Sequence, residues 1–432
     1  MINYDKAIEY INISAQRGSH PGLERILQLL KLMGNPQEDV RCIHVAGTNG
    51  KGSVSVMLAS VLSAAGYTTG MFTSPYIYRI NESFRINGVN ISDDEFAEVI
   101  SFVSSFAEQM RDKPTEFEVM TATAFEYFKR KHCDAAVIEC GMGGKYDATN
   151  VITNPLLSII TNVAADHLSW LGNSVEEIAC HKAGIIKARR PVIFGGTDFK
   201  AEKVIAEKAA DMHSPFIEVH YNLLENVRNT SDGIVLSYGR FKNVKLSLFG
   251  AYQPRNAALV LASVELLREM LLEISDDAVY NGMKNALWQG RFETISLEPT
   301  VIYDGAHNPD GIKYAVESIR QRFGDKRVNV LIGVMADKDY ETMVKLLCPV
   351  VCRVYTVMPR NPRALDSFEL ADVFVRNERN ATAYEKLSEG LCTAYKDSVD
   401  NNRPLIALGS LYMYREVKDC LCKLKEKNKI GI

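Results

Sequence analysis

The feature that most constrains the fold is a short apolar run that leads through a glycine-rich turn into a helix-period stretch. Residues 41–46 (RCIHVA) predict a buried strand, and residues 47–53 (GTNGKGS) predict the turn. Apolar residues then recur at helical spacing over 54–65, and Gly66 provides a helix C-cap. A strand, a turn and a helix in this order form a βα unit, which favours a mostly parallel sheet.

Further β-rich runs continue this alternation. We expect strands at 70–73, 135–140, 156–161 and 191–194. Residues 214–250 differ, because FIEVHY, IVLSYG and VKLSLFG are short alternating runs separated by turn sequences. They predict a small antiparallel sheet attached to the first domain.

After helices at about 256–272 and 277–287, the alternation starts again. Strands are expected at 300–304, 328–335, 354–359 and 404–409. The predicted fold class is therefore α/β. Residues 1–294 form a P-loop-type domain with a mostly parallel sheet and the small β subdomain, and residues 295–432 form a Rossmann-like α/β domain.

Composition narrows the class of protein. The 432 residues are 47% hydrophobic and 24% charged, with a net charge of −3, which is typical of a globular protein. Lysine and arginine are spread along the chain, so we expect no nucleic-acid partner. Nine cysteines without paired C-x-x-C motifs indicate reduced thiols. The first residues have no apolar h-region and no run is long enough to span a membrane, so we expect a cytoplasmic protein without a membrane partner.

The glycine-rich turn has the chemistry of a phosphate loop. Backbone N–H groups and a helix N-terminus point at one place, Lys51 adds a positive charge, and the Ser53 hydroxyl suits Mg²⁺. The spacing departs from G-x-x-x-x-G-K-[ST], because Val45 stands at the first glycine position and Gly52 separates the lysine from the serine. A glycine-rich turn that only packs a helix on a sheet is the competing interpretation. The predicted ATP contacts here are Thr48, Asn49, Gly50, Lys51, Gly52 and Ser53.

A metal partner is expected at the carboxyl end of a neighbouring strand. Glu139 ends the apolar run AAVIE, and strands buried on both faces rarely carry acids without a partner. Asp166 and His167 follow the run LLSIIT, and a neutral imidazole there could be a ligand. Taken alone, His167 is more often a satisfied surface histidine.

Ordered motifs over about residues 17–415 carry a family resemblance. HVAGTNGKGS, TSPYI, IECGMGGKYDATN, TNVAADHLSWLG, HKAGIIK, WQGRFE, YDGAHNPDG, MADKD and LGSLY follow the order of the folylpolyglutamate synthase/dihydrofolate synthase family. That family belongs to the Mur ligase superfamily. The segments TSPYI, GMGGKYDATN and DGAHNP resemble the folate branch in particular.

The resemblance implies roles for individual residues. The implied Mg²⁺ ligands are Ser53, Ser74, Glu139 and His167, and the further ATP contacts are Asn256, Arg291 and Asp304. Lys182 would be carbamylated by CO₂, which turns a cation into a carboxylate beside the magnesium. A solvated helix lysine is the alternative for Lys182. The implied cofactors are ATP and Mg²⁺, and the resemblance also allows K⁺ as a monovalent cation.

The resemblance also implies substrate contacts. Glutamate would be held by His307, Asn308 and Ser410, although helix capping competes for these residues. A pterin-binding region would include Phe117, Glu118 and Ala148, although Phe117 could be a core residue. The implied catalytic residues are Lys51, Lys182 and His307.

The expected reaction is ATP-dependent ligation of L-glutamate to a folate carboxylate. A carboxylate is a poor electrophile, so ATP would convert it to an acyl phosphate that the amine of glutamate attacks. We expect a monomer with small-molecule partners, and a bifunctional enzyme that also makes dihydrofolate from dihydropteroate. A UDP-muramoyl amino-acid ligase and a nucleotide-dependent switch protein with incidental ATPase activity are the alternatives.

Overall fold

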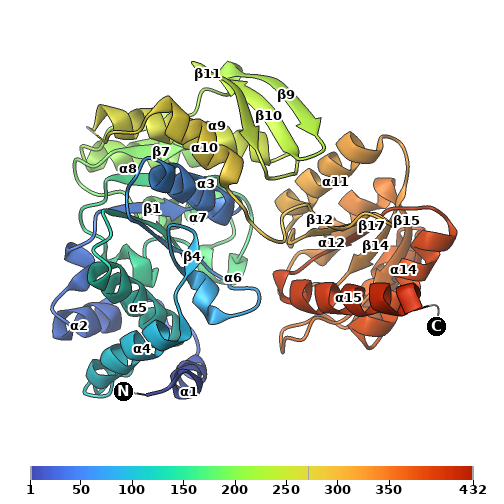
Figure 1. The fold of residues 1–432 in the computed structure, drawn as a ribbon, viewed down its shortest axis with the longest axis horizontal. Coiled ribbons are helices and arrows are strands. Elements are labelled where there is room, and N and C mark those ends of the chain that lie inside the picture. Colours follow the sequence, from blue (N-terminus) through green and yellow to red (C-terminus); the bar gives the residue numbers. More distant parts are fainter. Residues whose placement is uncertain (1, 271, 431–432) are drawn as a thin grey trace. The chain divides into compact units, whose positions relative to one another are not determined.

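The computed structural model describes residues 2–270 and 272–430, which form two compact units (Figure 1). The first unit takes the chain up to Ala164, Ser169–Ser247 and Pro254–Leu287; the second takes Ala165–Leu168, Leu248–Gln253 and the chain from Trp288 on. This division differs from a single boundary at residue 294, because two short segments of the preceding chain make their contacts with the second unit.

An eight-stranded sheet forms the centre of the first unit, in the order β4-β3-β2-β5-β1-β6-β7-β8. Its strands are β1 (Cys42–Ala46), β2 (Thr69–Phe72), β3 (Phe84–Ile86), β4 (Val89–Asn90), β5 (Ala135–Glu139), β6 (Leu157–Ile160), β7 (Val192–Phe194) and β8 (Phe216–Glu218). The pairs β2–β3 and β3–β4 are antiparallel, and the pairs from β2 through β5, β1, β6 and β7 to β8 are parallel. The mostly parallel sheet is therefore confirmed. Its central strands β5, β1 and β6 are buried throughout, which is why they are continuous apolar runs.

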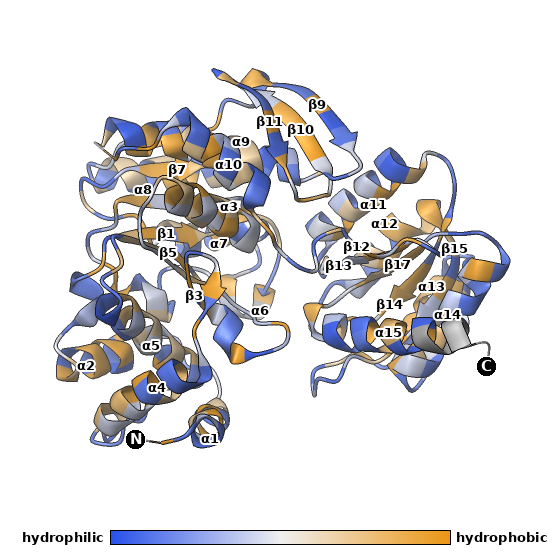
Figure 2. Ribbon diagram, viewed as in Figure 1, coloured by the Kyte–Doolittle hydropathy of each residue, from blue (hydrophilic) through white to orange (hydrophobic). Residues whose placement is uncertain are grey.

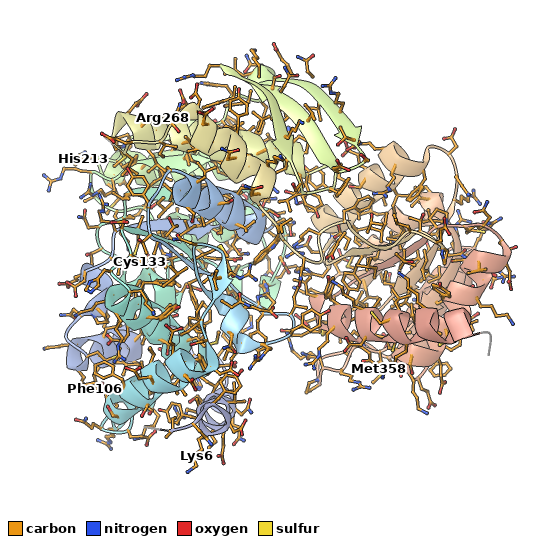
Figure 3. All side chains as sticks on the ribbon, in the orientation of Figure 1. Lys6, Phe106, Cys133, His213, Arg268 and Met358 are labelled. Carbon is orange, nitrogen blue, oxygen red and sulfur yellow. The ribbon has the colours of Figure 1, made fainter. Side chains whose placement is uncertain are left out.

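Helices accompany this sheet: α1 (Tyr4–Ala15), α2 (Glu24–Leu32), α3 (Lys51–Ala64), α4 (Asp93–Ala107), α5 (Glu116–Arg130), α6 (Leu168–Leu171), α7 (Val175–Ala183), α8 (Phe199–Asp211), α9 (Gln253–Glu269) and α10 (Asp276–Asn285). Capping boxes start α4, α5 and α7, where a Ser or Thr side chain and a Glu three residues later satisfy the first amides. Apolar side chains fill the interior of the unit, where Cys133 is buried (Figure 3). All nine cysteines are free thiols, as predicted.

The small sheet contains β9 (Leu224–Thr230), β10 (Gly233–Tyr238) and β11 (Phe241–Leu246) in the antiparallel order β11-β10-β9. The assignment of FIEVHY to this sheet was wrong, because Phe216–Glu218 is β8 and pairs parallel with β7. A strand that returns after the helix α8 is placed parallel to its predecessor, which alternation alone does not reveal. The strand β9 was missed because its side chains are almost all exposed and hydrophilic (Figure 2).

The second unit has a six-stranded sheet in the order β12-β13-β17-β14-β15-β16. Its strands are β12 (Glu293–Ser296), β13 (Val301–Asp304), β14 (Val328–Ile332), β15 (Val351–Thr356), β16 (Asn380–Ala383) and β17 (Leu405–Leu408). Its helices are α11 (Pro309–Phe323), α12 (Tyr340–Leu347), α13 (Ser367–Arg376), α14 (Leu387–Asp400) and α15 (Tyr414–Ile430). Only β12 pairs antiparallel, so the predicted α/β class is confirmed here as well. In residues 2–270 and 272–430, no helix has both the length and the apolar character needed to cross a membrane.

Candidate active site

The glycine-rich loop lies between β1 and α3, as the sequence predicted. Gly50 is the N-cap of α3 with a φ of 83°, and the helix begins at Lys51. The Lys51 ammonium donates hydrogen bonds to the carbonyl oxygens of Gly47 (3.1 Å) and Thr48 (3.2 Å). A positive charge is thus folded back over a loop that ends at a helix N-terminus, which is the arrangement that favours a bound phosphate.

The segment that follows β6 braces this loop. The backbone N–H of Thr48 donates to the carbonyl oxygen of Asn162 (3.0 Å), and the N–H of Asn49 donates to the side-chain oxygen of Asn162 (2.8 Å). The Thr161 hydroxyl donates to the carbonyl oxygen of Asn49 (2.6 Å). These two loop amides therefore hold the loop in shape, and the start of α3 is the part of the loop best placed to meet an anion.

The backbone of Gly47 packs closely against the Thr161 side chain. Its φ is 152°, and a Cβ there would lie 1.8 Å from the Thr161 hydroxyl oxygen. We expect Gly47→Ala to displace the loop and weaken ADP binding about tenfold or more, measured by titration calorimetry.

Gly66→Ala is the matched control for this variant. Gly66 also has a positive φ of 93°, but no atom of the described residues lies within 4 Å of an added Cβ. It should lose about 1 kcal/mol of stability and keep its ADP affinity. Unchanged ADP binding by Gly47→Ala would contradict the proposed role of the loop shape.

Several predicted ligands follow adjacent strands of the first sheet. In the order β2-β5-β1, Glu139 ends the strand next to the loop strand β1, and Ser74 follows β2, one strand further out. Glu139 is in register with Val45 of β1, and both Glu139 and Ser53 are buried. Hydroxyl and carboxylate oxygens are the ligands that Mg²⁺ prefers, so the donor set fits this ion.

Of two further predicted residues, Asn256 lies in the first unit and His167 in the second. Asn256, in α9, adjoins the loop, because a Cβ at Gly50 would lie 2.6 Å from its side-chain oxygen. His167 belongs to the segment Ala165–Leu168, which is part of the second unit. Among the residues that the structure describes, no three His, Cys, Asp or Glu side chains form a group that could hold a metal ion.

Lys182 lies in α7 and is only 2% exposed. The interpretation of this residue as a solvated helix lysine was therefore wrong. The backbone N–H of Lys145 donates to the carbonyl oxygen of His181 (2.7 Å), so the loop after β5 lies against the end of α7. A fully buried ammonium is unfavourable, which agrees with a lysine that is modified or specifically paired.

The residues predicted for the pterin region have structural roles in the first unit. The Phe117 ring packs against Phe72, with 5.8 Å between the ring centroids, and adjoins the core. Glu118 is buried, closes the capping box of α5 with Thr115 and forms an ion pair with Arg25 (3.1 Å). Ala148 is also buried and begins the short helix Ala148–Val151. Core packing and capping therefore account for two of these positions without a ligand.

In the second unit, Asp304 ends β13 and is buried. Its carboxylate accepts hydrogen bonds from the Tyr252 hydroxyl (3.1 Å) and from the backbone N–H groups of Phe292 (3.0 Å) and Ala306 (2.7 Å). Burial raises the pKa of Asp304, against the opposing effects of the Arg291 charge and these hydrogen bonds. The carboxylate thus organises the turn that carries Arg291 and the loop that leads to His307.

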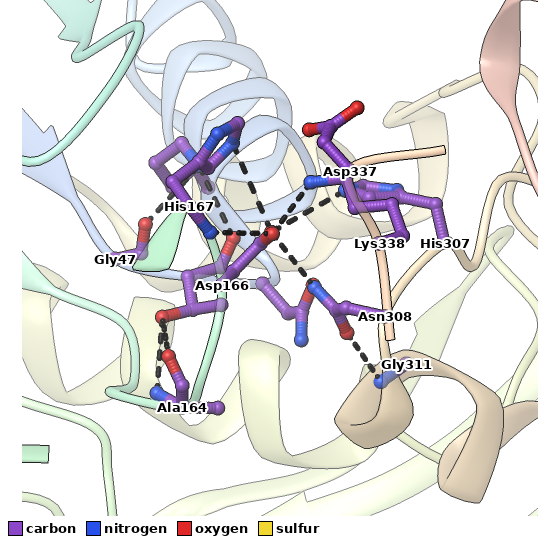
Figure 4. Close-up of polar contacts among 12 residues, drawn as sticks. Gly47, Ala164, Asp166, His167, His307, Asn308, Gly311, Asp337 and Lys338 are labelled. Carbon is purple, nitrogen blue, oxygen red and sulfur yellow. Dashed lines mark hydrogen bonds and ion pairs between the residues drawn. The ribbon is translucent and has the colours of Figure 1, made fainter. Parts of the chain in front are cut away.

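A cluster of polar side chains surrounds Asp166 (Figure 4). Its carboxylate accepts from the Lys338 ammonium (2.5 Å) and the Asn308 side-chain amide (3.0 Å), and the His307 Nε2 atom lies 3.5 Å away. Burial alone would raise the pKa of Asp166, but the hydrogen bond and charge of His307, with the charges of Lys338 and His167, hold it well below its usual value. This convergence could not be predicted from the sequence, because Asn308 and Lys338 are about 140 residues or more from Asp166 along the chain.

The capping alternative is supported for two residues predicted to bind glutamate. Asn308 is the N-cap of α11 and accepts from the backbone N–H of Gly311 (2.8 Å), while its amide donates to Asp166. The Ser410 hydroxyl accepts from the backbone N–H of Tyr412 (3.2 Å) at the start of the short helix Leu411–Met413. These side chains follow β13 and β17, which are adjacent in the sheet.

Two family models that match this chain identify the class of protein. The family model for the Mur ligase middle domain matches residues 45–264, and the model for the Mur ligase glutamate ligase domain matches residues 290–411. The chain therefore has the two domains of a Mur-type, ATP-dependent ligase. The first match contains the glycine-rich loop and the second contains the six-stranded sheet.

The relatives then narrow the class. A dihydrofolate synthase/folylpolyglutamate synthase of Bacillus subtilis is 36% identical over 96% of this chain and 98% of its own length. The Mycobacterium tuberculosis folylpolyglutamate synthase complexed with ADP and AMPPCP superposes with a TM-score of 0.88 at 28% identity, covering 98% of this chain and 99% of that one. E. coli FolC in complex with DHPP and ADP has a TM-score of 0.84 at 27% identity, covering 99% of each chain. The chain belongs to the folylpolyglutamate synthase/dihydrofolate synthase family, and the resemblance in its motifs is confirmed.

Proposed function

We propose that this enzyme uses ATP to join L-glutamate to the carboxylate of a folate. The observation that carries the proposal is the braced loop of residues 47–53 between β1 and α3, with the Lys51 ammonium folded over it and Glu139 in register on the neighbouring strand. Nearly full-length relatives named for folate ligation disfavour the UDP-muramoyl alternative.

The glycine-rich loop and the residues that the family resemblance implies would bind the nucleotide and the metal. In this proposal ATP contacts residues 48–53 and Asn256, and Mg²⁺ would be held by Ser53, Ser74 and Glu139, together with His167. Bound Mg²⁺ would neutralise charge on the phosphates. The positive charge of Lys51 stabilises the transferred phosphoryl group. Stabilising this group is the main catalytic task, because the reaction needs no covalent enzyme nucleophile.

The acceptor carboxylate attacks the γ-phosphorus of ATP, which forms an acyl phosphate and releases ADP. The amine of glutamate then attacks the acyl carbon and displaces phosphate, leaving an amide. In the second unit, Arg291 and Asp304 contact ATP in this proposal, and His307, Asn308 and Ser410 position glutamate. Asp304 is well suited to hold a fixed place, because three hydrogen bonds orient its carboxylate.

Lys182 would act as a carbamate, and Phe117, Glu118 and Ala148 would line the acceptor region. A carbamate needs a neutral amine for its formation, and burial favours the neutral amine. We further propose a monomeric cytoplasmic enzyme with small-molecule partners, in which K⁺ serves as an accessory cation.

An acceptor panel tests the function. Purified protein with ATP, Mg²⁺ and glutamate is offered tetrahydrofolate, dihydropteroate or a UDP-muramoyl acceptor, and ADP and ligated product are measured. We expect product with tetrahydrofolate and also with dihydropteroate, since the relative from Bacillus subtilis is named for both activities. Extension of tetrahydrofolate alone would contradict bifunctionality. ADP release that is indifferent to every acceptor would favour the switch protein instead.

A further inference from the structure

A chain of buried polar side chains runs from the middle of β1 to the loop after β5. His44 is fully buried, three residues before Gly47. Its Nε2 atom lies 2.8 Å from the Thr149 hydroxyl oxygen and 3.1 Å from the Cys140 sulfur. The Thr149 hydroxyl in turn lies 2.5 Å from a carboxylate oxygen of Asp147. A sheet core has no need of such a chain, because polar groups are costly to bury.

The number of protons available decides which group donates and which accepts in each of these hydrogen bonds. The Thr149 hydroxyl has one proton, and the Asp147 carboxylate is a closer and stronger acceptor than the Cys140 sulfur at 3.4 Å. Thr149 therefore donates to Asp147 and accepts from His44, whose Nε2 carries the proton. Burial, followed by the Lys187 charge, lowers the pKa of His44 to about 3, so the imidazole is neutral. Among the described residues, Nδ1 of His44 has no hydrogen-bond partner.

Asp147 connects Thr149 to the backbone of the loop that follows β5. Its carboxylate accepts from the backbone N–H groups of Met142 (2.8 Å) and Thr149 (3.0 Å), so it holds both ends of residues 142–149. Gly141 immediately precedes the held segment, and a Cβ there would lie 2.7 Å from the Phe117 ring, so the loop of residues 141–149 adjoins the predicted acceptor region. Ala148 lies within the segment itself.

We propose that His44 is a positioning residue that, through Thr149 and Asp147, sets the loop of residues 141–149 for the acceptor. This inference rests on the proposed function, because it assigns the loop to the acceptor and not to the nucleotide. The nucleotide loop is braced separately by residues 161–164. A change at His44 therefore acts on acceptor KM more than on nucleotide affinity.

Two substitutions of His44 form a matched pair. In His44→Gln the side-chain amide can take the place of Nε2 and still donate to Thr149, whereas in His44→Asn it is too short to reach. We expect His44→Asn to raise the KM for tetrahydrofolate about tenfold, with the calorimetric Kd for ADP within about twofold of the unchanged protein. His44→Gln should stay close to the unchanged protein in both quantities.

Thr149 offers an independent pair if His44→Asn fails to fold. Thr149→Ser keeps the hydroxyl and should behave like the unchanged protein, and Thr149→Val should raise acceptor KM as His44→Asn does. Amide hydrogen exchange at Met142 and Thr149 should become faster in His44→Asn and Thr149→Val only. Equal KM values for the two His44 variants, or an ADP Kd that rises as much as acceptor KM, would overturn the positioning role.

Failure of the proposed function is distinguishable from failure of this inference. If the unchanged protein ligates no folate acceptor, the proposed function fails, and the assignment of the loop to the acceptor fails with it. Exchange at Met142 and Thr149 still decides whether His44 orders the loop. Faster exchange in His44→Asn but not in His44→Gln supports that part, and equal exchange in both overturns it.

Discussion

Replacing Lys51 with alanine is expected to reduce the rate of glutamate ligation about a thousandfold. The ammonium lies over the loop, 3.1 Å from the carbonyl oxygen of Gly47, where it can meet developing charge on a transferred phosphoryl group. In the alanine variant, water would stabilise this developing charge less well than a fixed ammonium does. The measurement is acceptor-dependent ADP release at saturating ATP, with thermal unfolding of the same sample.

The fold should survive the Lys51→Ala change. The side chain makes its hydrogen bonds to two loop carbonyls next to the start of α3 and is not part of the apolar core, so its loss costs about 1 kcal/mol. Lys31→Ala, at an exposed position in the last turn of α2, is the matched control and should keep full activity. Loss of cooperative unfolding in Lys51→Ala would indicate a structural role, and retained ligation would contradict the catalytic one.

The second large effect is expected for Lys182→Met. Methionine fills a similar volume without a charge, so the free energy of unfolding should stay the same or rise, because a buried lysine is costly to the fold. Ligation should nevertheless fall about a hundredfold, since the carbamate beside the metal would be lost. Both quantities are measured on one preparation, by chemical denaturation and by product formation.

Lys200→Met is a suitable control for Lys182→Met, because Lys200 lies in α8 with a side chain that is 68% exposed. It should leave both quantities unchanged. The chemical state of Lys182 is checked separately by intact mass at ample bicarbonate, where one added CO₂ is expected. A bare amine under those conditions, or full activity of Lys182→Met, would contradict the carbamate.

Much of the candidate site could be predicted from local sequence. The run that ends at Ala46, the loop and the helix from Lys51 are contiguous, so periodicity and turn residues are enough to predict them. Glu139 was identified because an acid that ends a buried apolar strand is unusual. The same reasoning misplaced FIEVHY and missed β9, because alternation does not say which sheet a strand joins and exposed strands have little apolar pattern.

The sequence by itself determined the α/β class, the strand–loop–helix unit around residues 47–53 and the family, because each depends on residues close together along the chain. Only the tertiary structure decided that Lys182 is buried, that His44 reaches Asp147 through Thr149, and that Lys338 and Asn308 converge on Asp166. Burial and convergence depend on which distant segments pack together. Sheet order and chain crossings set that packing, and no local period encodes it.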